Sequence, residues 1–173
     1  NILFDDVPII AHARTLSSLY AMLGPLEGDA WTVTDFETRA RLLWGGNLID
    51  LVPSGDPAQA WFRERVSGPE YETIRIKPPT QVFDHTFEFH VPDDFVRLSY
   101  RGRAHCDGDI TVHIPGRKVI FLGDLMFYRR FPWLGDCDLE GWIDRLGAIL
   151  ELDVDIVIPG HGRPFTDVAG ALS

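Results

Sequence analysis

Hydrophobic and polar positions alternate along the second half of the chain, as they do in strands with one buried face. The alternation is clearest in Thr86–Val91, Phe95–Tyr100 and Ile110–Ile114, and the unbroken apolar run Val119–Leu122 follows them. The segment Pro92–Asp94 separates the first two of these four stretches, the segment Pro115–Arg117 separates the last two, and both are typical of hairpin turns. Because the run Val119–Leu122 has no polar position, it predicts a central strand that is covered on both faces.

The first half of the chain follows a helical pattern instead. Helical segments are expected over 13–23, 31–43 and 56–66, and glycines or Gly-Pro pairs stand where each should end, so that residues 13–68 are mostly helical. A short β-branched run over 7–11 predicts a buried strand. Near the C-terminus, one apolar face over 138–152 predicts an amphipathic helix with Asp138 as its N-cap, followed by a short buried strand over 155–158.

This order of helices and strands places the chain in the α/β class. Its 173 residues suit one domain, 1–173, with the helical region 13–68 inside it. Asp and Glu number 26 against 16 for Lys and Arg, which gives a formal net charge of -10. A surface of this sign repels phosphate backbones, so we expect no nucleic-acid partner.

The sequence contains no stretch near the roughly 18 apolar residues that cross a bilayer, so we expect no membrane partner. Two cysteines, Cys106 and Cys137, make no disulfide framework and fit a reducing compartment, although a single bridge between them stays open. We therefore expect a cytoplasmic protein. A homodimer is an open alternative to a monomer.

Three segments place a potential metal ligand at a strand end, beside glycine. They are Gly102–Asp109, with His105; Phe121–Asp124, with Asp124; and Ile158–Gly162, with His161. Imidazole nitrogen and carboxylate oxygen are ligands for zinc, iron or manganese. Each segment alone has a plainer interpretation as a structural histidine or a turn aspartate. The ordered set, with a strand before each, indicates a metal site much more specifically.

Residues 82–167 resemble the C-terminal half of the metallo-β-lactamase fold. The resemblance rests on G-x-A-H-C-x-G-D at 102–109, I-F-L-G-D at 120–124 and V-I-P-G-H-G at 157–162. It implies a metallo-β-lactamase-like α/β-β/α sandwich that is incomplete at its N-terminus. It also implies that His105 binds the first metal, that Asp124 bridges two metals and that His161 binds the second. The implied cofactor is zinc, two ions in the intact protein, with iron or manganese as alternatives.

The chain departs from that family in one respect that matters for the site. The family's leading H-x-H-x-D-H motif is absent, and no two of the six histidines are two residues apart. We therefore expect this chain to be the C-terminal part of a longer hydrolase and to be inactive in isolation. The alternative is a natural domain that has lost half of its metal site.

The resemblance implies a metal-dependent hydrolase that uses a metal-bound hydroxide on a small-molecule ester, thioester, lactone or amide. Arg129, Arg130 and Phe131 follow Asp124 closely, so they are candidates for binding substrate, against a plainer interpretation as a surface loop. Cys106 should point away from the metal. Asp107 and Asp109 should shape the turn. Two alternatives are mononuclear iron chemistry on a thiol or persulfide, and a non-catalytic fragment.

Overall fold

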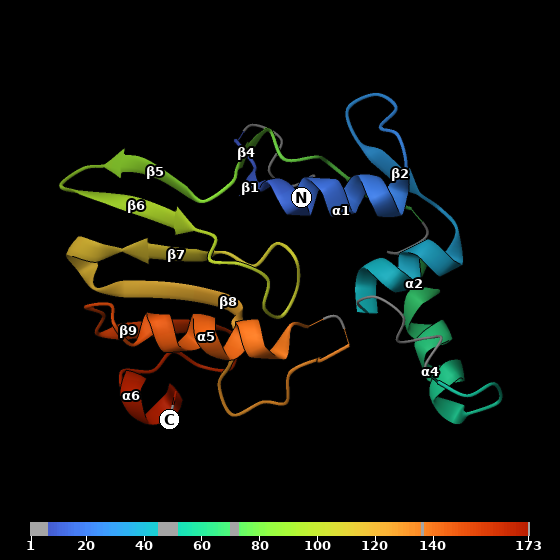
Figure 1. Cartoon of the computed structure of the whole chain (residues 1–173). Helices are drawn as coiled ribbons and strands as arrows, with labels where there is room; N and C mark the ends of the chain where they lie inside the picture. Colours follow the sequence, from blue (N-terminus) through green and yellow to red (C-terminus); the bar gives the residue numbers. More distant parts are fainter. Residues whose placement is uncertain (1–6, 45–51, 70–72, 136, 173) are drawn as a thin grey trace. The chain divides into compact units, whose positions relative to one another are not determined.

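The computed structural model describes residues 7–44, 52–69, 73–135 and 137–172 (Figure 1). The chain divides into two compact units. One comprises residues 1–9 and 16–80, and the other comprises residues 10–15 and 81–173. The expectation of one domain over 1–173 stays a prediction.

The described residues of the first unit form three helices and a small sheet. Its helices are most of α1 (Ala13–Leu23), α2 (Phe36–Trp44) and α4 (Pro57–Val66), and its strands β2 (Trp31–Val33) and β3 (Ile74–Ile76) pair antiparallel. Asp56 caps α4 by accepting a hydrogen bond from the backbone N–H of Ala58, with Pro57 in the first turn. The prediction of a helix over 31–43 was wrong at its start, because Trp31 and Val33 are buried on one side of a strand.

The second unit is built on a five-stranded sheet in the order β5-β6-β7-β8-β9 (Figure 1). Its strands are β5 (Thr86–Val91), β6 (Asp94–Ser99), β7 (Thr111–Ile114), β8 (Val119–Phe127) and β9 (Ile156–His161). Strands β5 to β8 pair antiparallel, and β8 pairs parallel with β9. The short turn η3 (Pro115–Arg117) joins β7 to β8. The predicted hairpins are therefore confirmed, and β8 has a paired strand on each side. The prediction that β8 is covered on both faces was wrong, because Phe121 is 40% exposed while Ile120 and Leu122 on the opposite face are buried.

The remaining elements of the second unit are two helices and a two-stranded parallel pair. Strand β1 (Ile10–His12) pairs with β4 (Gln81–Phe83). The crossover from β8 to β9 contains α5 (Leu139–Ile149), as a parallel connection requires, and α6 (Val168–Leu172) lies near the C-terminus. Asp138 is the N-cap of α5, as predicted.

The core of this unit forms between the sheet and α5. Ile120 and Leu122 of β8, Ile149 of α5 and Val157 of β9 are completely or almost completely buried. Trp142 of α5 joins the same cluster and donates a buried hydrogen bond of 2.8 Å from Nε1 to the backbone oxygen of Leu125. The middle of β8 is thereby held between its neighbouring strands and the helix.

Within the described residues, no helix is both long and apolar enough to cross a membrane. Cys106 and Cys137 are both free, so the bridge that the sequence left open is not formed.

Candidate metal centre

The three residues predicted to bind metal lie on three different segments of the second unit. His105 lies in the loop between β6 and β7, Asp124 lies within β8 and His161 is the last residue of β9. Strand β8 does not end at Leu122 as predicted but continues to Phe127. The backbone at Gly123 has φ +52°, and the register between β8 and β9 shifts at this glycine. Asp124 therefore projects from an irregular part of a strand rather than from a turn.

Asp124 and His161 are in direct contact. A carboxylate oxygen of Asp124 lies 3.3 Å from Nε2 of His161, and the two side chains are 41% and 57% exposed. Gly160 makes this approach feasible, because a Cβ there would collide with the same carboxylate and with the backbone of Gly123. The glycine before the histidine lies within β9 (Ile156–His161) and thus has a packing role.

His105 and His161 both contact the same aromatic ring. The ring of Phe127 stacks on His161 with 4.7 Å between centroids, and it lies 5.4 Å from the ring of His105. Trp142 packs edge-on against His105 at 5.3 Å. The Nε2 atom of His105 is buried and has no hydrogen-bond partner among the described residues. A buried polar nitrogen without a partner is costly, and an ion is one ligand that would satisfy it.

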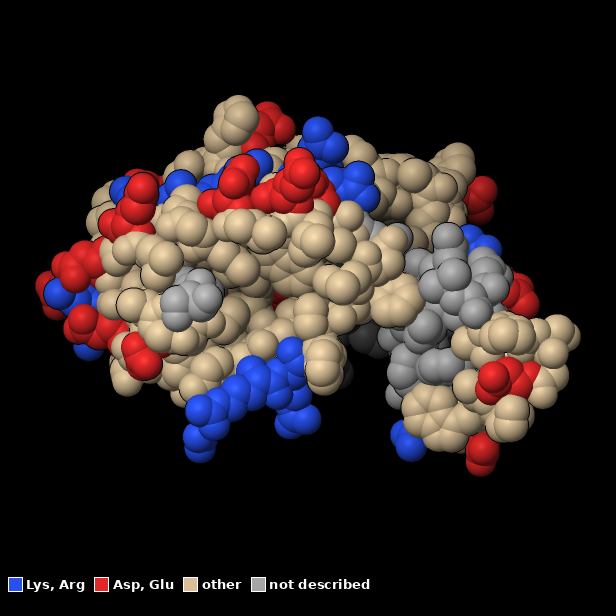
Figure 2. All heavy atoms as spheres, turned by 60° about the horizontal axis from the view of Figure 1, so that its bottom comes forward, with Lys and Arg blue, Asp and Glu red and all other residues tan. Residues whose placement is uncertain are grey.

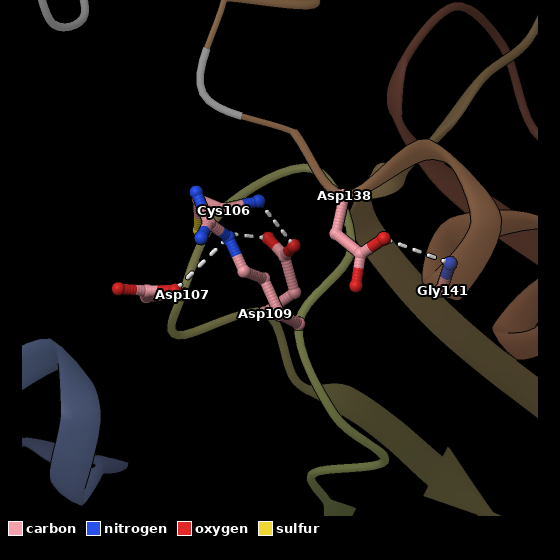
Figure 3. Close-up of polar contacts among 6 residues, drawn as sticks. Cys106, Asp107, Asp109, Asp138 and Gly141 are labelled. Atoms are coloured by element: carbon pink, nitrogen blue, oxygen red, sulfur yellow. Dashed lines mark hydrogen bonds and ion pairs between the residues drawn. The ribbon is translucent and has the colours of Figure 1, made fainter.

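His105, Asp124 and His161 do not together form a group whose ligand atoms all lie within 4.8 Å of one another. Among the described residues, the one group of three or more that meets this distance is His105, Cys106 and Asp109. Asp109 accepts hydrogen bonds from the backbone N–H of Cys106 at 2.6 Å and from its thiol at 3.0 Å (Figure 3). Asp109 shapes the turn, as expected, but it also lies near His105.

The expectation that Cys106 points away from His105 was wrong. It assumed the alternation of a strand, but residues 101–110 form a bent loop whose side chains do not alternate. Partial burial, together with the hydrogen bond to Asp109, raises the pKa of the Cys106 thiol to about 12. Without a metal ion the sulfur is therefore protonated at neutral pH and acts as a hydrogen-bond donor.

The loop that carries His105 is held against the start of α5. The backbone N–H of Asp138 donates to the carbonyl of Ala104 at 2.7 Å, while the Asp138 side chain accepts from the N–H of Gly141 at 3.1 Å (Figure 3). A Cβ at Gly141 would lie 2.7 Å from the carbonyl of Arg103, so glycine is needed for this close packing. An ion pair of 3.1 Å between Arg103 and Asp107 closes the loop further.

The donor set suits a transition metal. His105, Asp124 and His161 offer imidazole and carboxylate, and Cys106 and Asp109 add a thiol and a second carboxylate beside His105. These are the ligand types of zinc and iron sites, and the unpartnered Nε2 of His105 fits such a role. From the sequence, Cys106 was expected beside His105 but without a metal role, and Asp109 was expected to shape the turn, with a hydrogen bond to a metal-bound histidine as the alternative. The closeness of both residues to His105 in the sequence, within four positions, could have indicated that they lie beside this ligand.

The predicted substrate-binding residues lie just after β8. Arg129 and Arg130 line an open hollow of ≈ 530 Å³ together with Tyr128, Gly162 and Arg163. The side chain of Phe131 is fully exposed and is not among the described residues that line this hollow. Sequence reasoning missed Arg163, which follows His161 by two residues.

Comparison with known proteins decides the family. The family model described as the metallo-beta-lactamase superfamily matches residues 30–161. The chain belongs to the metallo-beta-lactamase superfamily. Members of this superfamily are typically hydrolases that bind metal ions, often zinc. No curated protein matches the chain.

Solved structures agree with the metallo-β-lactamase fold. A metallo-beta-lactamase family protein from Thermus thermophilus is similar over 96% of this chain and 50% of its own, with 16% identity and a TM-score of 0.60. A metallo-beta-lactamase from Pontibacter korlensis is 22% identical over 56% of this chain and 46% of its own, with a TM-score of 0.49. The chain thus spans about half the length of these structures.

Proposed function

We propose that the protein containing this chain is a metal-dependent hydrolase that cleaves an ester, thioester, lactone or amide of a small molecule. The observation that carries the proposal is the arrangement around Phe127. His105 and His161 pack against this ring, and Asp124 contacts His161 at 3.3 Å. Membership of the metallo-β-lactamase superfamily supports the same reaction class.

Ions held in such a site would lower the pKa of water, so that hydroxide would be available near neutral pH, and would polarise the bond that is attacked. The residues of this chain would hold the ions. His105 would offer its unpartnered Nε2, His161 its ring nitrogen and Asp124 its carboxylate, with two zinc ions as the expected number. The contact between Asp124 and His161 would also orient the imidazole.

Phe127 and Trp142 would make one side of the site apolar. Both rings contact His105, and Trp142 is buried. A lower local dielectric strengthens the attraction between a cation and its ligands. The two rings also restrict the rotation of His105, so that the imidazole is held ready for an ion.

The test is the metal content of the complete natural protein and of three variants, His105→Ala, Asp124→Asn and His161→Ala. We expect inductively coupled plasma mass spectrometry to find zinc in the purified wild type. Each variant should contain much less zinc than the wild type. His90→Ala is the matched control, because His90 is an exposed histidine on β5. Wild-type protein without a bound transition metal would contradict the proposal.

A panel of four substrates then tests the reaction class: a nitrophenyl ester, an acyl thioester, a γ-lactone and a β-lactam amide. We expect hydrolysis of at least one, with activity lost on chelation and in the three variants but kept in His90→Ala. Hydrolysis that survives chelation, or activity that Asp124→Asn leaves unchanged, would contradict the proposal.

A further inference from the structure

Beyond the metal ligands, the most distinctive feature of the second unit is a cluster of three arginines around the hollow described above. Arg129 and Arg130 follow β8, and Arg163 follows β9. None of the described residues that line the hollow is acidic. Figure 2 shows one group of Lys and Arg side chains with no Asp or Glu side chain among them, whereas the other Lys and Arg side chains in view lie near acidic ones. In a chain of formal net charge -10, this concentration of positive charge is unusual.

The three arginines have no ion-pair partner within the residues that the structure describes. Other cations of the chain do have one: Arg75 pairs with Asp29, Arg97 with Glu88 and Lys118 with Asp153. Like charges held together repel one another unless an anion lies between them. The cluster is therefore well suited to an anionic ligand.

The backbone brings the two sides of the hollow together. The N–H of Tyr128 donates to the carbonyl of His161 at 2.9 Å, which fixes the start of one loop against the start of the other. Gly162 has φ +103°, and a Cβ there would collide with the carbonyl of Tyr128. Arg129 itself has φ +56°, which is uncommon for a residue with a side chain.

The side chain of Arg129 has an aromatic support. Its guanidinium carbon lies 5.3 Å from the centre of the Tyr128 ring, so a cation–π contact favours one orientation of this long side chain. A guanidinium whose orientation is restricted loses less entropy when it binds. Planar guanidinium groups also match the paired oxygens of carboxylate and phosphate.

The hollow lies next to the candidate metal centre along the chain. Gly162 directly follows His161, and Phe127, which stacks on His161, directly precedes Tyr128. From this geometry we infer that the hollow binds an oxyanion, a carboxylate or phosphate group carried by the small molecule that the protein hydrolyses. This inference rests on the proposed function for the identity of the ligand as the substrate. The anion site itself rests on the arginines alone.

The first experiment measures binding without catalysis. Inorganic phosphate and succinate are titrated into the complete protein by calorimetry, and the measurement is repeated with Arg129→Gln, Arg130→Gln and Arg163→Gln. We expect at least one of the two anions to bind, with affinity falling roughly three- to tenfold for each arginine removed. Binding of phosphate alone or of succinate alone would identify the group.

Arg117→Gln is the control for loss of one positive charge, because Arg117 is exposed in the η3 turn at the other end of β8. Arg129→Lys keeps the charge but not the planar group, and we expect weaker binding than in the wild type. If neither anion binds, or if the three glutamine variants bind as the wild type does, the inference is wrong. Equal weakening by Arg117→Gln would also contradict it.

The second experiment links the site to hydrolysis. A neutral nitrophenyl ester is compared with one that carries a terminal carboxylate or phosphate. We expect Arg163→Gln to raise KM for the anionic ester and to leave the neutral ester unchanged. Arginine-dependent anion binding without metal or hydrolysis would contradict the proposed function but not the anion site. If both esters are hydrolysed and the three glutamine variants have the KM of the wild type for each ester, only the anion site is contradicted.

Discussion

At the scale of single residues, two glycines differ in whether the structure requires glycine at their position. Gly162 has φ +103° and lies against the carbonyl of Tyr128, whereas Gly147 of α5 has no positive φ and open space where a Cβ would be. Glycine is required at the first position. At the second it only raises the conformational entropy of the unfolded chain.

These two glycines therefore predict opposite effects of the same substitution. Gly162→Ala should lower the free energy of unfolding by more than ~1 kcal/mol, because the new methyl group meets backbone in a strained conformation. Gly147→Ala should raise it by ~0.5–1 kcal/mol, because alanine favours the helix. Urea unfolding followed by circular dichroism measures both. Stabilisation by Gly162→Ala would show that the two loops do not approach as described.

His113 of β7 is the residue whose pKa predicts a dependence of stability on pH. It is buried, and its Nε2 has no hydrogen-bond partner among the described residues. Burial lowers the pKa of His113, and the positive charge of Arg97, its pairing partner on β6, adds to this effect. The folded protein thus keeps this imidazole neutral at a pH where the unfolded chain already protonates it.

The contribution of this neutral imidazole to the free energy of unfolding is complete above the ordinary histidine pKa of about 6.5. It is lost as the pH falls below that value. We expect His113→Gln to reduce the loss of unfolding free energy between pH 7.5 and pH 5.5. His90→Gln, at an exposed position on β5, should leave it unchanged. Thermal unfolding at the two pH values measures the difference. An identical loss in wild type and His113→Gln would contradict the prediction.

At the scale of elements, helix α5 connects the core to the candidate metal centre. Its N-terminus holds the His105 loop through Asp138, and its Trp142 both contacts the His105 ring and donates to the backbone of Leu125. Leu125 follows Asp124 in β8. One helix thus positions two predicted metal ligands that are 19 residues apart in the chain.

Trp142→Phe tests this connection. The variant leaves the Leu125 carbonyl buried without its donor, which should cost ~1–3 kcal/mol of unfolding free energy. It should also reduce metal affinity, because the ring beside His105 becomes smaller. Trp61→Phe, at a position 45% exposed on α4, should change unfolding free energy by no more than ~0.5 kcal/mol. Equal effects of the two substitutions would argue against a special role of Trp142.

At the scale of the whole molecule, the parallel pair β8–β9 has two roles. It forms the centre of the core through Ile120 and Val157, and its far end brings Phe127 opposite His161. Metal binding to residues at that end should therefore be linked to the stability of the whole unit.

Chelation of the purified protein tests this linkage. If the ions are held as proposed, a chelator should lower the melting temperature of the wild type, and added zinc should restore it. A metal at 100 times its dissociation constant stabilises the folded state by ~2.7 kcal/mol. In His105→Ala the chelator should have a smaller effect. Differential scanning calorimetry measures the shift, and an unchanged melting temperature in the wild type would contradict the linkage.

Four features could be predicted from the sequence alone: the family, the hairpins of the sheet, the helix capped by Asp138 and the position of that helix before the last strand. These features follow from local patterns: alternation, one apolar helical face, turn residues and short motifs with fixed order. Predictions from local patterns were wrong where pairing with a distant segment determines the secondary structure. Trp31–Val33 is a strand because β3, some forty residues later, pairs with it.

The assembly of the candidate site could not be predicted in this way, because it depends on contacts between distant segments. Three features depend on the packing of separate segments: the contacts of the Phe127 ring with two histidines, the hydrogen bond of Cys106 to Asp109, and the position of Arg163 and Arg129 around one hollow. Local sequence specifies backbone preferences. Which side chains meet across two loops is set by the register of β8 and β9 and by glycines that let their backbones approach.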